Sequence, residues 1–579
     1  MLEDSSIVTA PPTPGPADSR STAELDAAVA QLSAHRAAWL AVSSSARATL
    51  LDELILSVAG VADRWAAEAA RAKGLAPDDP AAAEEVLAGP YITLRHLRLQ
   101  RRSLLDIARR GLPRIPGPVT TLPDGRAVAR VMPADLYDRL LFPGVSAEVW
   151  MQPGIGVAEL PATQALAYQR PDGGGVCLVL GGGNVTSIAP LDAIYKLFVA
   201  NRVVILKMHP AIAYMGPILE QGLGPLIRAG FLRIVHGGAA EGAYLVNHPG
   251  VDELHITGSY RTYEVIVFGP GPEGDERRRR DEPILHKPFT AELGNLTPVI
   301  VVPGRWSDSE IAHHADNIAT MLTNNAGFNC TTARLIITPA GWRLRHRLLE
   351  AIRARLQSIR SRAAFYPGAA DRFDRFVKAH PQAELYGEGA GDRLPWGLIA
   401  DLDPGQADDL CFTTEAFCGL FGELPLPSDS TADFLERAVA FANDSTWGSL
   451  NATLIVQPAS LRDPATALAV QRAVADLRYG TVSINHWSTV GYAFATTPWG
   501  AFPGHVRHDI GSGTDVVHNT LMFSRSEKTV IRAPFRAWPK PIWFGTHATA
   551  RRLAPKLVEF EAHPSLLRVV GMLPLALRG

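Results

Sequence analysis

Residues 175–184 read GVCLVLGGGN and residues 203–208 read VVILKM, and these two stretches decide the fold. Each contains an uninterrupted apolar run, which is typical of a strand buried on both faces of a sheet. FLRIVH at 231–236 and VDELHIT at 251–257 repeat the pattern, and helical spacing fills the interval over 188–200. Glycines follow three of these four runs. This alternation of strands and helices predicts an α/β fold with a parallel, doubly wound sheet.

The rest of the chain divides around this sheet. We expect residues 1–24, which are acidic, polar and Pro-rich, to form a disordered leader. Residues 25–292 then contain a helical opening and the first sheet, 293–494 a second α/β section, and 495–579 a return segment and a tail. We interpret the charged stretch at 269–283 as a solvated loop, and the end of the chain, from APFRAWPKPIWFG at 533–545 onward, as irregular. A length of 579 residues also favours two or more domains.

Composition narrows the class of protein. Hydrophobic residues make up 47% and charged residues 20%, as in soluble globular proteins, and the net charge of -2 gives no general attraction to nucleic acid. The N-terminus lacks the basic start and apolar run of a signal peptide, and no stretch approaches the roughly 20 apolar residues of a spanning helix. Four cysteines without a CxxC pair predict no disulfide framework and no metal site. We expect a reducing, cytoplasmic location.

Three sites in the sequence could carry chemistry. Cys330 lies in TNNAGFNCTTARLIIT, between a predicted helix and a strand, where a thiolate could attack a carbonyl carbon. The alternative is an ordinary core cysteine. Glu292 in TAELGNLTP could act as a general base, or could be a solvated residue at a strand end. The turn from Gly181 to Asn184 could bind an anion at the start of a helix, or could be an ordinary tight turn.

Together these motifs resemble the aldehyde dehydrogenase superfamily. The resembling segments cover 175–210, 289–302 and 321–337, joined by VDELHITGS, TEAFCGLFG, YGTVSINH and TPWGAFPG in the family's order. The resemblance covers about residues 25–525 and implies an aldehyde dehydrogenase-like fold. That fold has a Rossmann-type cofactor domain within 25–292, a catalytic α/β domain within 293–494, and an oligomerisation arm within 495–579. Gly-Gly-Gly-Asn184-Val-Thr replaces the family's usual Pro-Trp-Asn-Phe-Pro, which marks a divergent member.

The resemblance also implies roles for eight residues. Three are catalytic: the nucleophile Cys330, the base Glu292 and the oxyanion donor Asn184. Five contact the cofactor: Lys207 at the adenine ribose, Gly258 and Ser259 at the pyrophosphate, and Glu415 and Phe417 at the nicotinamide ribose and ring.

The implied activity is NAD(P)-dependent oxidation of a small-molecule aldehyde to a carboxylic acid, through a thiohemiacetal and a thioester on Cys330. A first alternative is a CoA-acylating aldehyde dehydrogenase (acyl-CoA reductase), which would pass the acyl group between the same cysteine and CoA. The presence of Glu292 favours hydrolysis. A second alternative is a catalytically silent scaffold, against which the intact Cys330, Glu292, Asn184 and Lys207 argue.

Two further expectations concern the cofactor and the partners. Pro210 stands where many NAD-preferring members have a ribose-binding glutamate, and Lys207 and His209 could supply positive charge there. We therefore expect the use of NADP as well as NAD, unless a carboxylate such as Glu241 reaches the same ribose. The resemblance implies a homodimer or homotetramer built by a strand exchanged between subunits. For the tail at 532–579 we favour a packing arm against a neighbouring subunit over weak peripheral contact with a membrane.

Overall fold

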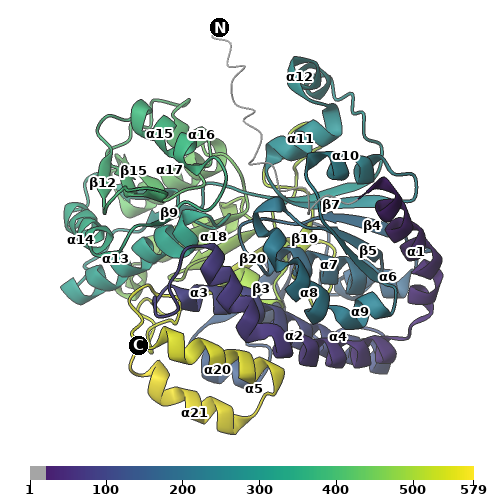
Figure 1. Cartoon of the computed structure of the whole chain (residues 1–579). Coiled ribbons are helices and arrows are strands. Elements are labelled where there is room, and N and C mark those ends of the chain that lie inside the picture. Colours follow the sequence, from purple (N-terminus) through teal and green to yellow (C-terminus); the bar gives the residue numbers. More distant parts are fainter. Residues whose placement is uncertain (1–20) are drawn as a thin grey trace.

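The structure is a computed structural model that describes residues 21–579 (Figure 1). Residues 1–20, most of the expected leader, lie outside the described residues. The leader was predicted to extend to residue 24, but helix α1 (Thr22–Ala41) begins before that point. The Ser21 side chain accepts a hydrogen bond from the Glu24 N–H, and the Glu24 carboxylate accepts one from the Ser21 N–H. This reciprocal pair satisfies two backbone donors that a helix start otherwise leaves free.

The first sheet is the predicted parallel one. Its strands follow the order β6-β5-β4-β7-β8, all parallel, with bounds β4 (Val176–Leu180), β5 (Val203–Lys207), β6 (Leu232–Val235), β7 (Glu253–Gly258) and β8 (Phe289–Leu293). The first three strands are almost entirely buried, because helices cover both faces of a parallel sheet (Figure 1). Those helices include α7 (Ile188–Phe198), α8 (Gly216–Gly222), α9 (Gly224–Arg228), α10 (Ala239–Asn247) and α11 (Tyr260–Phe268).

The helical opening section packs on this part of the molecule. Helix α2 (Ser44–Ala72) lies against α4 (Ile92–Arg110) and α8, and α1 lies against β5. Helix α3 (Ala82–Val86) runs through the π-helical turn η1 (Leu87–Tyr91) into α4. Buried aromatic side chains such as Trp39 and Trp65 join these helices to the core of the first sheet.

A second, mixed sheet of eleven strands forms the other half of the molecule, in the order β1-β2-β3-β20-β17-β16-β9-β10-β15-β14-β12. Its central strands are β9 (Pro298–Val301), β10 (Leu335–Pro339), β14 (Trp396–Ile399), β15 (Leu420–Leu426), β16 (Asn451–Ile455) and β17 (Thr481–Ile484), with β12 (Glu384–Tyr386) at one edge. The accompanying helices are α13 (Asp308–Thr323), α14 (Arg345–Ser358), α15 (Ala369–Ala379), α16 (Leu410–Thr413), α17 (Thr431–Asp444), α18 (Pro464–Asp476) and α19 (Val490–Phe494). Helix α13 begins with a capping box formed by Ser307 and Glu310.

The smaller elements complete the chain. Two-stranded sheets pair β11 (Arg362–Ala363) with β13 (Arg393–Leu394), and β18 (Trp499–Gly500) with β19 (Val516–Val517). Short helical segments are η2 (Leu160–Thr163), α6 (Leu166–Gln169), η3 (Pro210–Met215), η4 (Asn324–Gly327) and η5 (Pro458–Arg462). Within residues 21–579, no helix has the length and apolar character needed to cross a membrane.

The segment expected to form the oligomerisation arm contains strand β20. Strand β20 (Ser526–Arg532) pairs in parallel with β17 of the same chain and antiparallel with β3 (Ser146–Met151). Beyond β3 the sheet continues through β2 (Ala127–Met132) to the edge strand β1 (Val119–Thr121). Strand β20 therefore has a paired neighbour from its own chain on each side.

Two predictions of irregular structure were wrong. The charged stretch at 269–283 contains helix α12 (Gly271–Arg279). The tail forms helices α20 (Ala550–Ala562) and α21 (Leu566–Ala576), which lie together at the lower edge of the molecule in Figure 1. Helix α20 packs on α2, α3 and α4 of its own chain, and α21 packs on α20 and α5 (Leu136–Leu141).

Candidate active site

Cys330 follows a tightly turned segment between α13 and β10. Asn325, Ala326 and Gly327 all have positive φ, at 52°, 55° and 80°. A Cβ on Gly327 would lie 2.7 Å from the backbone of Cys418, so this turn requires glycine. The turn fixes the direction of the chain just before the cysteine.

The Cys330 thiol lies among apolar and aromatic side chains from both halves of the molecule. It contacts a buried cluster of Tyr195, Leu450, Trp499 and Val517. Burial raises the thiol pKa well above its usual value, and the carboxyls of Glu292 and Glu415 raise it further because a second negative charge nearby opposes ionisation. The thiol is therefore protonated in the structure and needs a base or a positive charge to become a nucleophile.

Glu292 is buried at the end of β8. The indole N–H of Trp499 donates a 3.0 Å hydrogen bond to Glu292 Oε1, and the backbone of Glu292 forms a bridge with Gly513. Burial raises the pKa of this carboxyl to about 8, and the charge of Asp192 contributes in the same direction. A carboxyl with this pKa is poised to exchange a proton near neutral pH.

Asn184 is held beside the loop that carries Cys330. Its Nδ2 donates to the carbonyl of Phe328 at 2.8 Å, and its own backbone carbonyl accepts from Asn325 Nδ2 at 3.0 Å. Lys73 anchors this network from α2, with its ammonium 2.8 Å from Asn325 Oδ1 and paired to the buried carboxylate of Glu85. One N–H of the Asn184 amide thus bonds to the loop before Cys330, and the other has no hydrogen-bond partner among residues 21–579.

Glu415 and Phe417 lie on the loop between α16 and β15. Burial raises the pKa of Glu415 to about 7, against the opposing charges of Arg334 and Arg372. Glu415 Oε1 is buried and has no hydrogen-bond partner among the described residues, and a Cβ on Gly294 would lie 2.0 Å from Oε2. Phe417 contacts Phe328 and Tyr366 with ring centroids 6.0 and 4.9 Å away. The loop therefore presents an unsatisfied carboxyl oxygen beside an aromatic cluster.

The remaining candidate residues line the ends of β5 and β7. The buried ammonium of Lys207 donates to Gly237 O at 2.7 Å, and burial lowers its pKa to about 8. Gly258 ends β7, and Ser259 caps α11 by accepting a 3.2 Å hydrogen bond from Arg261 N–H. The N-terminus of α11 thus points out of the carboxyl end of the sheet, which is where such folds bind dinucleotides.

His209 does not supply the positive charge expected of it. Its ring stacks on Tyr366 with centroids 5.9 Å apart, and burial, helped by Lys207, lowers its pKa to about 4. It is therefore neutral at pH 7. Glu241 acts electrostatically on Lys207 and raises its pKa, and its Oε2 accepts a 2.7 Å hydrogen bond from Gly238 N–H. A carboxylate therefore does lie beside Lys207.

Several residues of this site were missed in the sequence. Trp499 binds Glu292, and Arg334 donates to the carbonyls of Cys418 and Gly327. Tyr492 shares a 3.2 Å hydrogen bond with Ser187. Burial raises the pKa of its phenol, and the charges of Cys330 and Glu292 raise it further. Trp499 stood inside a recognised motif, TPWGAFPG, but nothing in its spacing indicated that it contacts Glu292.

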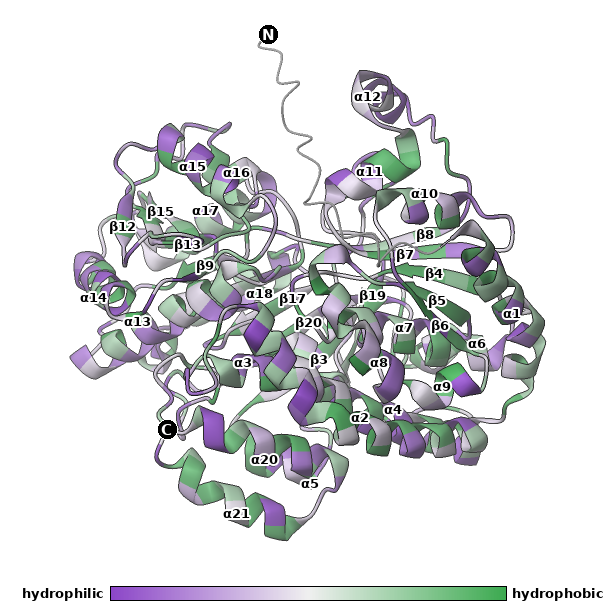
Figure 2. Cartoon of the chain, viewed as in Figure 1, coloured by the Kyte–Doolittle hydropathy of each residue, from purple (hydrophilic) through white to green (hydrophobic). Residues whose placement is uncertain are grey.

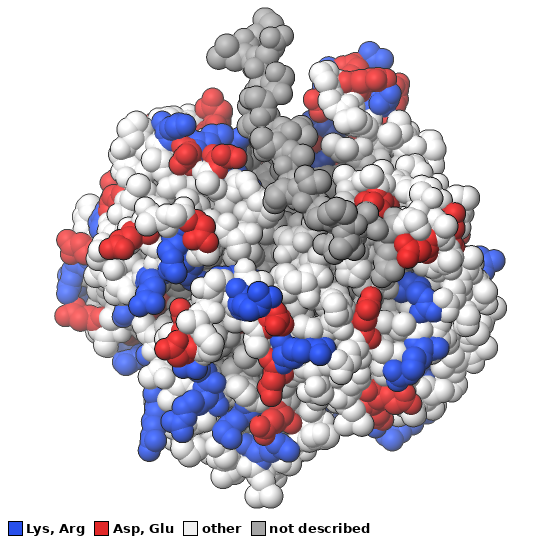
Figure 3. Space-filling model, viewed as in Figure 1, with Lys and Arg blue, Asp and Glu red and all other residues white. Residues whose placement is uncertain are grey.

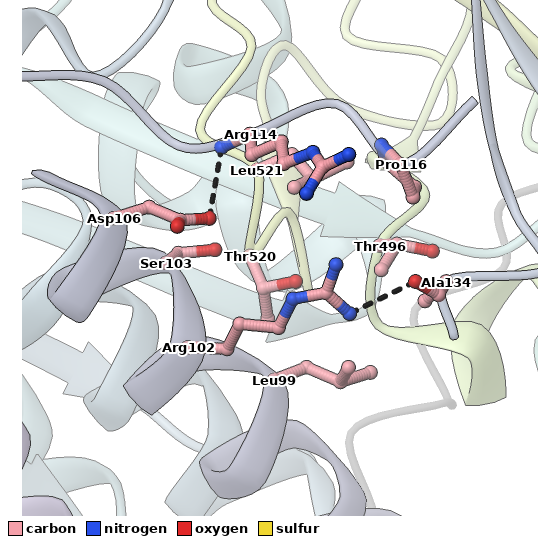
Figure 4. A pocket seen from close by; sticks show the side chains of 10 residues that line it. All are labelled: Leu99, Arg102, Ser103, Asp106, Arg114, Pro116, Ala134, Thr496, Thr520 and Leu521. Atoms are coloured by element: carbon pink, nitrogen blue, oxygen red, sulfur yellow. Dashed lines mark hydrogen bonds between the residues drawn. The ribbon is translucent and has the colours of Figure 1, made fainter. Parts of the chain in front are cut away.

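A separate small hollow lies between α4 and the return segment (Figure 4). Arg102 donates to the carbonyl of Ala134 there, and Asp106 accepts from Arg114 N–H. The buried hydroxyls of Thr496 and Thr520 have no partner among residues 21–579. None of the eight predicted site residues lines this hollow.

The two sheets and the cysteine loop between them define a two-part α/β protein with a buried thiol and carboxyl at the junction. A family model described as the aldehyde dehydrogenase family matches residues 148–369. N-succinylglutamate 5-semialdehyde dehydrogenase of Ectopseudomonas mendocina (strain ymp) is 28% identical over 304 residues, which are 50% of this chain and 58% of that protein. The protein of the same name from Burkholderia mallei (strain SAVP1) is 29% identical over 191 residues, which are 32% of this chain and 35% of that protein. The chain therefore matches less than two thirds of these relatives.

Solved structures share the fold over most of the chain. Aldehyde dehydrogenase C (AldC) of Pseudomonas syringae, a mutant in complex with NAD+ and octanal, has a TM-score of 0.60 at 18% identity, covering 89% of this chain and 90% of that one. NADP-dependent glyceraldehyde-3-phosphate dehydrogenase from Bacillus halodurans C-125, in complex with NADP, has a TM-score of 0.57 at 18% identity, covering 89% and 92%. The family model and the solved aldehyde dehydrogenase structures therefore agree on the fold of this chain.

Proposed function

We propose that this protein oxidises an aldehyde to a carboxylic acid with NAD or NADP, and that Cys330 is the covalent nucleophile. The observation that carries the proposal is that Cys330 and Glu292 meet at Trp499, although Glu292 ends β8 of the first sheet and Cys330 lies on the loop before β10 of the second. Each carboxyl or thiol there has a pKa shifted by its surroundings, as is common for groups that take part in catalysis.

The residues near this pocket fit a dinucleotide. The buried, unpartnered Oε1 of Glu415 is free to accept hydrogen bonds from ribose hydroxyls, and Gly294 leaves room for that carboxyl. Ser259 and the N-terminus of α11 would hold the pyrophosphate, and Lys207 the adenine ribose. The bound nicotinamide would accept a hydride from the substrate carbon.

The chain's own residues would act in sequence. The Cys330 thiol first releases its proton to solvent water. The resulting thiolate adds to the carbonyl carbon, while the second N–H of the Asn184 amide and the Cys330 backbone N–H stabilise the oxyanion. Once the substrate carbon has lost its hydride, the acyl group remains on sulfur as a thioester. Glu292 then takes a proton from a water molecule, which attacks the thioester and releases the acid and the thiol.

The second step separates this proposal from its first alternative. A CoA-acylating enzyme needs no base for water, whereas Glu292 is held by Trp499 with a pKa of about 8. We therefore favour hydrolysis. The catalytically silent scaffold has less support, because a scaffold has no need of a strained cysteine turn or a buried, unpaired carboxyl oxygen.

Two features of the adenine-ribose region weaken the expectation that the protein uses NADP. His209 is neutral at pH 7, and the carboxylate of Glu241 is close enough to act on Lys207. A carboxylate at the adenine ribose favours the 2′-hydroxyl of NAD over a 2′-phosphate. We keep dual use as the proposal and expect Glu241→Gln to raise kcat/KM for NADP relative to NAD by about tenfold, close to 1.4 kcal/mol.

Location and assembly also remain proposals. Four free cysteines support a reducing compartment such as the cytoplasm. We propose a homodimer or homotetramer, with contact to a membrane surface as the alternative role of the tail. The outer face of α21 supports either partner, since it carries exposed Leu566, Leu567, Val570, Leu573 and Leu577 (Figure 2).

Steady-state rates with a panel of short aliphatic, long aliphatic and aromatic aldehydes test the activity, using both cofactors with and without CoA. We expect NAD(P)-dependent oxidation without CoA in the wild type, and loss of at least a thousandfold in Cys330→Ala. Cys177→Ala is the matched control, since that thiol is buried within β4. Turnover that requires CoA would establish the first alternative, and substantial turnover by Cys330→Ala would overturn the mechanism.

A further inference from the structure

A cluster of three metal-ligating side chains lies outside the candidate active site, where α15 ends and α16 begins. We propose that His380, Asp409 and Cys411 bind one divalent transition-metal ion, with Zn2+ the best match to the donors. The three ligand atoms lie within 4.8 Å of one another. The sequence-based expectation of no metal overlooked them because they form no short motif.

The hydrogen bonds of His380 determine which ring nitrogen faces the cluster. His380 Nδ1 lies 2.9 Å from the carbonyl of Phe376, an acceptor only, so Nδ1 carries a proton. Nε2 then faces both carboxylate oxygens of Asp409 at 3.1 Å and Cys411 Sγ at 4.0 Å. The lone pairs of His380 Nε2, the Asp409 carboxylate and Cys411 Sγ therefore point toward one another. Such an arrangement requires a cation between the three groups, either a proton or a metal ion. The Nδ1–carbonyl bond is the arrangement that orients metal-binding histidines.

The distances and charges suit a metal ion. Donor atoms around a tetrahedral zinc lie about 3.3–3.6 Å apart. The carboxylate is already close to this spacing from His380 Nε2, and the thiol, 4.0 Å from Nε2 and within 4.8 Å of the carboxylate, must approach by roughly 0.4–1.2 Å. With a neutral imidazole, a carboxylate and a thiolate, the ligands carry two negative charges, which a divalent ion neutralises. One nitrogen, one oxygen and one sulfur donor favour Zn2+ or Co2+ over Mg2+ and Ca2+.

The surroundings leave access for the ion. Asp409 has 7% of its side chain exposed, so an ion and a fourth ligand from water could reach it from solvent. The alternative is a protonated His380 that simply pairs with Asp409 and leaves the Cys411 thiol outside the interaction. That arrangement would bind no metal.

The position of the cluster gives the metal a structural consequence. Asp409 caps α16, which leads directly to Glu415 and Phe417. On the other side, Arg372 of α15 donates to the carbonyls of Ala416 and Phe417 at 3.0 and 3.1 Å. A bound ion would fasten the end of α15 to the start of α16 and so hold the loop that carries Glu415.

Titration with Co2+ tests the site, because a cobalt–thiolate bond has its own ultraviolet absorption band. The protein is used as Cys330→Ser, which removes the thiol of the candidate active site. We expect one Co2+ per chain with a thiolate band, displaced by Zn2+, and the same result when Cys177→Ala is added as a control. Adding Cys411→Ser should abolish the band. Asp409→Asn, which can still cap α16, should weaken binding at least tenfold.

Circular dichroism checks that each variant is folded. If Cys411→Ser does not fold, His380→Gln serves in its place and should lower the Co2+ affinity at least tenfold. Failure of the Cys330→Ser protein to bind stoichiometric Co2+ or Zn2+ would overturn the proposal. So would a thiolate band that survives Cys411→Ser.

Discussion

At the residue scale, we expect the raised pKa of Glu292 to govern the pH dependence of turnover. Burial raises this pKa to about 8, so the carboxyl is mostly protonated at pH 7 and cannot accept a proton from water. Raising the pH through 8 converts it to the carboxylate. We therefore expect kcat to rise about tenfold per pH unit below pH 8 and to level off above it, if hydrolysis limits the rate.

Glu292→Gln is the variant that checks this assignment. It should show a rapid burst of reduced cofactor, then slow turnover that no longer rises with pH, because the thioester forms but is not hydrolysed. Stopped-flow absorbance measures both phases. A variant that loses the burst together with turnover would show that Glu292 is needed before hydride transfer.

At the element scale, the backbone contact between β8 and the return segment positions Glu292. Gly513 has a φ of 116°, and a Cβ there would lie 2.0 Å from Ala291 O. We expect Gly513→Ala to push β8 and Glu292 out of place, lowering the free energy of unfolding by about 2–4 kcal/mol and steady-state activity by at least tenfold.

Gly504→Ala is the matched control for this prediction. Gly504 lies on the same segment with a φ of 126°, but a Cβ there meets nothing within 4 Å. Gly504→Ala should lower the free energy of unfolding by only about 1 kcal/mol, which is the cost of a left-handed backbone conformation for alanine. Urea unfolding measures both variants. If both variants lose the same free energy of unfolding, the close approach of Gly513 to Ala291 does not contribute to stability.

Elements whose pattern is local could be predicted from the sequence. The strands of the first sheet are buried on both faces, so they stand out as apolar runs, and the turn before Cys330 is marked by Gly327. Helix α12 was mistaken for a loop because of its glycines and prolines. Pro272 falls in its first turn, where a missing N–H costs nothing, and Glu273 with Arg277 and Glu276 with Arg280 pair along it.

Contacts between distant segments could not be predicted. Trp499 and Glu292 are 207 residues apart and meet only because the return segment runs beside β8, the edge strand of the first sheet. The neutral state of His209 follows from its burial against Tyr366, which no residue spacing reveals. Likewise, α20 contains Pro555 and was expected to be irregular, but packing against α2 and α4 stabilises it.

At the scale of the whole molecule, a buried ionic cluster fastens the tail to the body. Glu561 of α20 pairs with Arg95 at 3.3 Å and with Arg98 at 2.6 Å, and Arg95 also pairs with Asp138. Removing one charge leaves the buried Arg95 undercompensated. We expect Glu561→Gln to lower the free energy of unfolding by about 3 kcal/mol.

Glu559→Gln is the control, because it breaks an exposed pair with Arg568. It should lower the free energy of unfolding by less than about 1 kcal/mol. Similar losses in both would contradict the anchoring role.

The outer face of α21 is the place to test assembly. Leu567 is 85% exposed and makes no contribution to the core. Charges of both signs are scattered over the face of the molecule in Figure 3. Leu567→Asp should leave the melting temperature unchanged within about 2 °C. If α21 contacts another subunit, light scattering will show a smaller assembly. An unchanged assembly with weaker liposome binding would instead support contact with a membrane.

The central claim is that Cys330 forms a thioester during turnover, and mass spectrometry of the Glu292→Gln protein tests it most directly. The variant is mixed with aldehyde and oxidised cofactor, quenched with acid and digested. We predict an acyl adduct on the peptide that contains Cys330, formed only when cofactor is present and absent from Cys330→Ala. An adduct on Cys177, Cys411 or Cys418, or no adduct while the protein still turns over, would contradict the mechanism.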